Sequence, residues 1–187
     1  MRIIPNIGLD EVQREALAEI LKTLLSDEFV LSTKTRKHFW NVTGPRFQDI
    51  RAILETQFGV LVRMTNDLAE RIRTLGKYAP GTMTEFQKLT ELTEQPAVYA
   101  NADSMIVELL SDHETLIRRL RFEFKCCIEA GDCGTADLLA ATVRCHEEMA
   151  WMLRSLLDEN ERVARAAAAP AIDIAAMPRV AFSRPVS

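Results

Sequence analysis

The sequence predicts an all-α fold, namely a four-helix bundle with a short helix in a long crossover between helices two and three. Three observations predict this fold. Apolar residues recur at spacings of three and four along four long segments, as on one face of a helix. The 187 residues include only 7 Gly and 7 Pro, and this scarcity favours long helices over many short strands. No segment shows the alternating pattern that would indicate a strand.

The first two predicted helices lie on either side of a short break. Asp10 can cap the N-terminus of a helix that continues to about Trp40. The residues Asn-Val-Thr-Gly-Pro at 41–45 interrupt it. A second helix is predicted from about Phe47 to Gly76, because glycine commonly ends a helix. At 1.5 Å per residue, its roughly 30 residues span about 45 Å.

The second pair of helices follows a long connection. Residues 77–100 contain two prolines and a glycine around a short amphipathic piece at 86–89. A third helix is predicted from Asp103 to about Ala130, and a fourth from Thr135 to about Asn160. Two short connections around a long one indicate a bundle with one crossover. The bundle domain is predicted to occupy residues 1–160, and residues 161–187, rich in Ala and Pro, an extended tail.

Composition limits the function classes. A formal charge of −4 argues against nucleic-acid binding by the whole surface, although a local basic arm stays open. No stretch approaches 18 uncharged apolar residues, so we expect no membrane span. The apolar run at the start of the sequence is too short for a signal peptide, so we expect a cytoplasmic protein. Four cysteines, at 126, 127, 133 and 145, match no metal-binding spacing. Reduced thiols are the simplest expectation, and a Cys127–Cys133 disulfide remains an alternative.

Polar residues form one stripe on the second predicted helix. Arg51, Glu55, Asn66 and Glu70 fall within about 100° of one another around the helix. Two carboxylates on one stripe could supply oxygen ligands for iron or another hard divalent ion. The alternative is a solvated face or a network of salt bridges between subunits.

The histidines give no metal-binding pattern of their own. A di-iron site inside a bundle uses Glu-x-x-His pairs, and no histidine here has a glutamate three residues before it. His113 and His146 each have neighbouring carboxylates but no second histidine nearby in the sequence. Both are therefore predicted to be partly buried histidines with ordinary hydrogen bonds.

Two blocks of sequence carry a family resemblance. The first comprises KTRKHFWNVTGPRF at 34–47 and AERIRTLG at 69–76, and the second comprises GDCGTADLL at 131–139 and HEEMAWMLR at 146–154. Together they resemble the Dps family, the mini-ferritins or DNA-binding proteins from starved cells, over about residues 7–157. The resemblance implies a ferritin-like bundle that assembles into a hollow shell of twelve subunits. It also implies oxidation of Fe(II) by peroxide, storage of the ferric mineral and, in many members, DNA binding through basic termini.

The family's iron-oxidising site lies between two subunits, one supplying two histidines and the other supplying carboxylates. Carried over to this chain, Phe39 and Arg51 stand at the two histidine positions, and Asn66 stands at one carboxylate position. Glu55 and Glu70 remain, and they are the candidate iron ligands. The resemblance therefore implies a degenerate site.

Two residues near this site are interpreted differently from the family pattern. His38 lies one residue before Phe39, which turns it about 100° around the helix, so it does not replace the missing ligand. Arg51 carries a guanidinium that pairs with carboxylates and repels a cation. We expect Arg51 to take the electrostatic role of the metal by pairing with Glu70 or Glu55 across the subunit interface.

The remaining expectations concern iron entry and DNA. Asp132 and Asp137 match acidic positions that line a pore for iron in the family. The tail from residue 161 has four arginines against Glu161 and Asp173, a formal +2 that twelve copies could present to DNA together. One hypothesis is a shell that sequesters iron against oxidative stress, with weak or absent ferroxidase activity. The other is a non-enzymatic shell for DNA compaction, partner binding or a mixed assembly, and whether the chain is an enzyme stays open between them.

Overall fold

A computed structural model describes residues 5–157, which form five helices and no strand. The helices are α1 (Glu11–Asn41), α2 (Phe47–Thr74), α3 (Met83–Leu89), α4 (Ala102–Glu129) and α5 (Cys133–Leu156). The predicted all-α class, the four long helices and the short helix in the crossover are confirmed. The predicted end of the fourth helix, near residue 160, and the predicted tail at 161–187 lie outside the described residues.

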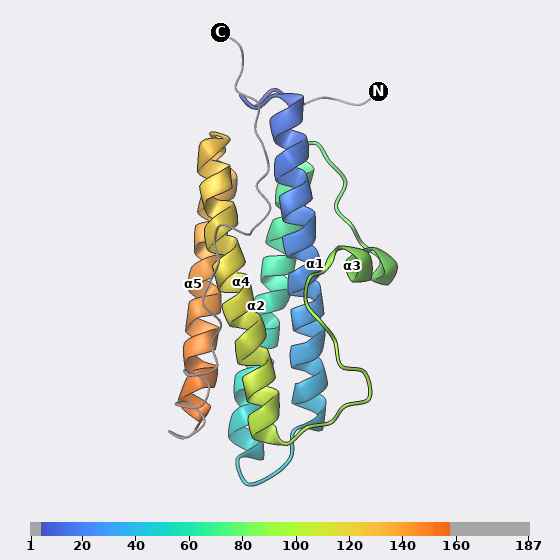
Figure 1. Cartoon of the computed structure of the whole chain (residues 1–187), viewed down its shortest axis with the longest axis vertical. Coiled ribbons are helices and arrows are strands. Elements are labelled where there is room, and N and C mark those ends of the chain that lie inside the picture. The colour runs from blue at the N-terminus through green and yellow to red at the C-terminus, as the bar shows by residue number, and fades with distance from the viewer. Residues whose placement is uncertain (1–4, 158–187) are drawn as a thin grey trace.

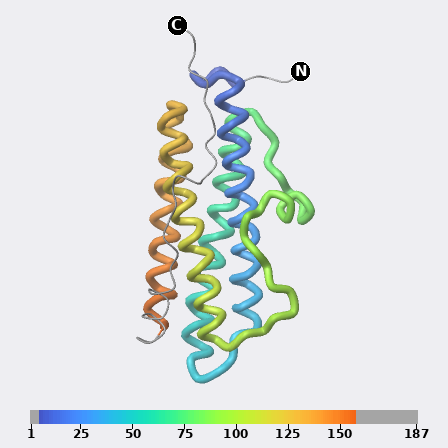
Figure 2. Tube along the Cα trace, viewed as in Figure 1, coloured from blue at the N-terminus to red at the C-terminus, as the bar shows by residue number. Residues whose placement is uncertain are grey.

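The four long helices lie side by side as two antiparallel hairpins, α1 with α2 and α4 with α5 (Figure 1). The chain between α2 and α4 runs along the outside of α1 over the length of the bundle and carries α3 (Figure 2). Because of this crossover, α2 and α4 point in the same direction. α3 packs on α1, where the rings of Phe29 and Phe86 stack with centroids 4.1 Å apart.

Local sequence signals explain where the helices begin and end. Asp10 accepts a hydrogen bond from the backbone N–H of Gln13, and the Gln13 side chain accepts one from the backbone N–H of Asp10, each at 2.8 Å. This reciprocal cap confirms the predicted start of α1. Gly76 follows α2 with a φ of +80°, and a Cβ there would lie 2.7 Å from Cδ of Pro5, so only glycine fits.

Apolar side chains from both hairpins fill the centre of the bundle. Each fully buried Leu or Ile contributes roughly 1.5–3 kcal/mol relative to an exposed one. The largest fully buried side chains are Leu17, Leu21, Leu24, Leu25, Leu31, Ile50, Leu54, Leu61, Leu68, Ile72, Leu75 and Ile106. None of the helices within residues 5–157 is both long and apolar enough to cross a membrane.

The seam between the two hairpins is unusually polar. Two buried ion pairs join α1 to α4, Asp27 to Arg119 at 3.1 Å and Lys34 to Asp112 at 2.6 Å, and a buried contact of 2.6 Å joins Glu28 of α1 to His146 of α5. Burial raises the pKa of Asp27, although hydrogen bonds from Glu91 and Thr90 oppose this. Buried pairs add little net stability, but removing one partner is costly. We therefore infer that these pairs fix how the hairpins are aligned.

Candidate functional site

The polar stripe of α2 lies on the outer side of the helix. Its apolar positions, including Ile50, Leu54 and Leu61, face the core and are buried. Glu55, Asn66 and Glu70 are exposed, and Arg51 is half-buried. The residues selected from the sequence therefore share an accessible face.

Phe39 and Arg51, which occupy the two expected histidine positions, touch each other. The guanidinium carbon of Arg51 lies 4.0 Å from the ring centroid of Phe39 and 5.9 Å from that of Phe47. A guanidinium over an aromatic ring is held by a cation–π interaction, about 0.5–1 kcal/mol at a partly exposed site. From the sequence we expected a carboxylate partner for Arg51, and the contact with the Phe39 ring was not predicted.

Further aromatic and arginine side chains extend this face. The Arg36 guanidinium carbon lies 5.2 Å from the Trp40 ring centroid and 5.4 Å from that of Phe58. Trp40 is 63% exposed and Phe47 is 37% exposed. This face therefore consists of Arg36, Phe39, Trp40, Phe47, Arg51 and Phe58. Exposed aromatics rimmed by charge are typical of protein–protein contacts.

The two candidate iron ligands, Glu55 and Glu70, are far apart within one chain. They are separated by 15 residues of one helix, or about 22 Å at 1.5 Å per residue. Ligands of one ion each lie about 2.0–2.6 Å from it, so these two carboxylates cannot share an ion in one chain. Within residues 5–157, no three His, Cys, Asp or Glu side chains are grouped to hold a metal. Any site that uses this stripe needs a second copy of the chain.

His38 lies on a different face from Phe39, as the one-residue displacement predicts. It is 1% exposed, and its Nε2 lies 3.1 Å from Oε2 of Glu108 on α4. Burial lowers the pKa of His38, and Glu108 only partly offsets this effect. His38 therefore belongs to the seam between the hairpins.

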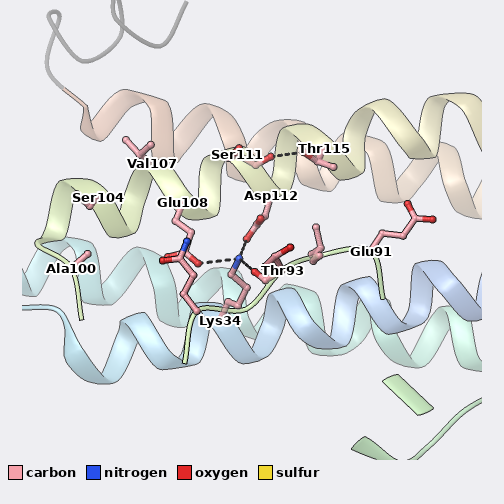
Figure 3. A pocket seen from close by; sticks show the side chains of 12 residues that line it. Lys34, Glu91, Thr93, Ala100, Ser104, Val107, Glu108, Ser111, Asp112 and Thr115 are labelled. Carbon is pink, nitrogen blue, oxygen red and sulfur yellow. Dashed lines mark hydrogen bonds and ion pairs between the residues drawn. The ribbon is translucent and has the colours of Figure 1, made fainter. Parts of the chain in front are cut away.

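A pocket of about 640 Å³ lies between α1, α4 and the crossover (Figure 3). Lys34 lines this pocket, and its ammonium lies 2.6 Å from Asp112, 3.0 Å from Glu108 and 2.9 Å from the Thr93 carbonyl oxygen. Burial raises the pKa of Asp112, while the hydrogen bond from Lys34 opposes this. These contacts reach both α4 and the crossover, so Lys34 ties the crossover to the bundle.

Three residues that the sequence pattern treats separately form one buried chain of hydrogen bonds. Nε2 of His146 lies 2.6 Å from Oε1 of Glu28, and Nδ1 of His146 lies 2.8 Å from Nδ1 of His113. The prediction that both histidines make hydrogen bonds is confirmed, but the prediction that they are only partly buried is wrong, because both are 0% exposed. Helical periodicity could have found their burial but not their pairing. His113 shares a face with the buried Leu109, Leu110 and Leu116. His146 shares one with the buried Val143, Met149 and Ala150.

The two aspartates assigned to an iron pore differ in their surroundings. Asp132 caps α5 and is 4% exposed, with its carboxylate 2.6 Å from Arg71 and bonded to Thr135. Asp137 is exposed. Because Asp132 is engaged within its own chain, Asp137 is the freer carboxylate of the two, and the pore itself stays a prediction.

Asp132→Asn is expected to destabilise the protein by about 1–3 kcal/mol at pH 7 and by less at pH 3. Burial alone would raise the pKa of Asp132, but hydrogen bonds from Arg71 and Thr135 outweigh it and hold this pKa below its ordinary value. A carboxyl with a lowered folded pKa contributes stability above its unfolded pKa and loses it as the pH falls through the folded value. Urea unfolding at both pH values measures this, with the exposed Asp137→Asn as control. Equal losses at both pH values would contradict the ionic role.

The four cysteines are free thiols. Cys126 and Cys127 are buried, Cys145 is half-buried and Cys133 is exposed. The alternative of a Cys127–Cys133 disulfide is therefore not realised in this structure. Burial raises the pKa of Cys127 to about 12, which suits a packing role better than a reactive one.

Comparisons with known proteins agree with this architecture. A family model of the ferritin-like domain matches residues 18–163. A low temperature-induced protein of Nostoc is 40% identical over 154 residues, covering 82% of this chain and 86% of the relative. The DNA protection during starvation protein of Helicobacter pylori is 30% identical over 139 residues, covering 74% and 96%. DpsC from Streptomyces coelicolor superposes with a TM-score of 0.80 at 27% identity, covering 83% and 91%. The chain belongs to the ferritin-like proteins and, among them, to the Dps family.

Proposed function

We propose that this chain forms a Dps-like mini-ferritin shell that sequesters iron and protects the cytoplasm against oxidative stress, with ferroxidase activity weak or absent at the usual intersubunit site. The observation that carries this proposal is the Arg51 guanidinium resting on the Phe39 ring. Neither side chain offers a lone pair to iron, and the fixed positive charge repels a divalent cation. Iron is the cargo of this shell, and we take twelve subunits as its size.

The polar stripe of α2 suits pairing with a second copy of itself. Its positions are symmetric about the point between residues 60 and 61, so an antiparallel pair of α2 helices would match Arg51 with Glu70, Glu55 with Asn66, and Gly59 with Val62. A Cβ added at Gly59 would meet only the Arg63 guanidinium, at 3.8 Å, which leaves the backbone open to close approach. Val62 is 40% exposed and would gain an apolar cover.

This pairing gives Arg51 a role at the interface. The exposed Glu70 carboxylate of the second copy would face the guanidinium that Phe39 holds in place. An arginine–carboxylate pair can form two parallel hydrogen bonds, which adds geometric specificity. The pair balances charge where family members use a metal, so the interface would be complete without iron.

Iron would reach the interior by another route. Asp137 is exposed, and we place it with Asp132 at a pore formed by several copies. Carboxylates on the interior wall would then collect Fe(III), because hard cations prefer oxygen ligands. Storage in this scheme is slow and does not depend on a dedicated oxidation site.

Slow loading in air tests iron storage. Fe(II) is added in small portions to the purified shell, and iron is measured in the protein peak after gel filtration. We expect iron to elute with the shell without a fast oxidation phase, and Asp137→Asn to slow uptake. Iron that fails to co-elute would contradict storage and favour the second candidate.

The second candidate is a non-enzymatic shell that compacts DNA, binds a partner or joins a mixed assembly. The loss of both nitrogen ligands at Phe39 and Arg51 favours it. DNA binding would depend on residues 161–187. Gel shifts at several salt concentrations, with and without those residues, separate this candidate from iron storage.

A further inference from the structure

The buried chain formed by Glu28, His146 and His113 joins both hairpins through α1, α5 and α4. Glu28 is 1% exposed and both histidines are 0% exposed. Oε2 of Glu28 and Nε2 of His113, the two ends of this chain, have no hydrogen-bond partner within residues 5–157. Each of the two hydrogen bonds joins one pair of atoms, and within residues 5–157 no three such side chains are grouped to hold a metal, so the arrangement suits a shared proton better than a metal ion.

The two hydrogen bonds restrict where protons can sit. Two Nδ1 atoms 2.8 Å apart need one hydrogen between them, and so do Nε2 of His146 and Oε1 of Glu28 at 2.6 Å. One solution keeps Glu28 ionised and both imidazoles neutral. The three side chains then have a total charge of −1, and His113 carries its hydrogen on Nδ1. The other solution adds one proton between Glu28 and His146. The three side chains then have no net charge, and His113 carries its hydrogen on Nε2.

The surroundings favour the neutral solution. Along the seam, the nearby cations are already paired: Lys34 contacts Glu108 and Asp112, and Arg119 contacts Asp27. On the α2 side the buried polar group is the uncharged Gln57, which donates to the Met149 carbonyl, one helical turn from His146. An unpaired buried carboxylate is very costly, and His146 is the ionic partner that Glu28 has within residues 5–157. Burial, and then the charge of His146, lowers the pKa of His113 well below its ordinary value, which keeps that ring neutral.

We propose that Glu28 and His146 share one proton beyond those of an ionised glutamate and neutral imidazoles, and that this proton latches the two hairpins together. Losing it leaves a negative charge in the seam with no counter-ion. The bundle therefore becomes less stable as the pH rises, because the folded state holds a proton that the unfolded chain releases.

Glu28→Gln separates the charge from the hydrogen bonds. The amide N–H that this change introduces can donate to Nε2 of His146, which then donates from Nδ1 to Nδ1 of His113. The chain of hydrogen bonds is kept, but the shared proton is no longer needed. This isosteric variant should fold, lose the extra proton on His146 and leave the His113 hydrogen on Nε2.

Solid-state ¹⁵N NMR of histidine-labelled wild-type shell at pH 7 tests the assignment directly. The chain has only three histidines, and His38→Gln identifies the signals of His38. We expect His113 with hydrogen on Nε2 only, and His146 with hydrogen on Nδ1, whether the shared proton lies nearer to His146 or to Glu28. A hydrogen on Nδ1 of His113, alone or with one on Nε2, would overturn the proposal.

Thermal unfolding from pH 7 to pH 10 provides the second measurement. The unfolding midpoint of the wild type should fall more with pH than that of Glu28→Gln. Glu114→Gln is the matched control, because Glu114 pairs with Arg154 at the surface and is not one of the three hydrogen-bonded residues. The unfolding midpoint of Glu114→Gln should depend on pH as that of the wild type does. If the midpoint of Glu28→Gln also shows the wild-type pH dependence, the shared proton does not hold the hairpins together.

Discussion

Replacing Phe39 by His, Arg51 by His and Asn66 by Asp in one protein is expected to create saturable Fe(II) binding and fast oxidation by peroxide. The triple variant restores two nitrogen ligands and one carboxylate, and it removes the guanidinium that now lies 4.0 Å from the Phe39 ring. Imidazole and carboxylate together suit Fe(II). We expect the oxidation rate to rise by at least about tenfold over the parent, since even ligand-supporting residues change metal-site function by 10–100-fold.

The control for this gain is the triple variant with Glu70→Gln added. Glu70 is exposed in the single chain, so this change should leave the fold intact while removing one proposed ligand. We expect the added rate to disappear. A triple variant that assembles normally and oxidises iron no faster than the parent would show that these positions do not form the site.

Arg51→Glu is expected to prevent assembly of the shell. In the proposed antiparallel pairing of α2, each interface would then place two new carboxylates opposite the two copies of Glu70. Like charges facing each other at an interface cost several kcal/mol, which is enough to dissociate many subunit contacts. Light scattering and native mass spectrometry should find small species in place of a shell.

The swap Arg51→Glu with Glu70→Arg should restore the shell, because each interface regains both ion pairs. Arg144→Glu is the control for surface charge, since Arg144 is exposed on α5, outside the paired helix. It should assemble like the wild type. If the swap stays dissociated while Arg51→Gln assembles, the pairing of Arg51 with Glu70 is wrong.

The helices and their order could be predicted from the sequence because their signals are local. The Asp10 cap, the Gly76 terminus and the long connection before α4 each act within a few residues or through loop length. The outward stripe of α2 followed from periodicity alone. These features need no knowledge of which helix packs on which.

The contacts that define the chemistry were not accessible in the same way. Arg51 lies on Phe39 because α1 and α2 pack with one particular rotation, which periodicity does not specify. His113 and His146 meet across α4 and α5 although 33 residues separate them. The anchoring of Lys34 depends on the path of the crossover, which no local signal encodes.

An anaerobic Fe(II) titration of the purified wild-type shell, followed by peroxide, tests the central claim most directly. With Arg51 and Phe39 at the ligand positions, we predict no tight binding that saturates at a fixed number of ions per interface, and oxidation no faster than in buffer. Stoichiometric binding followed by rapid oxidation would contradict the claim that this shell lacks a working site at its subunit interface.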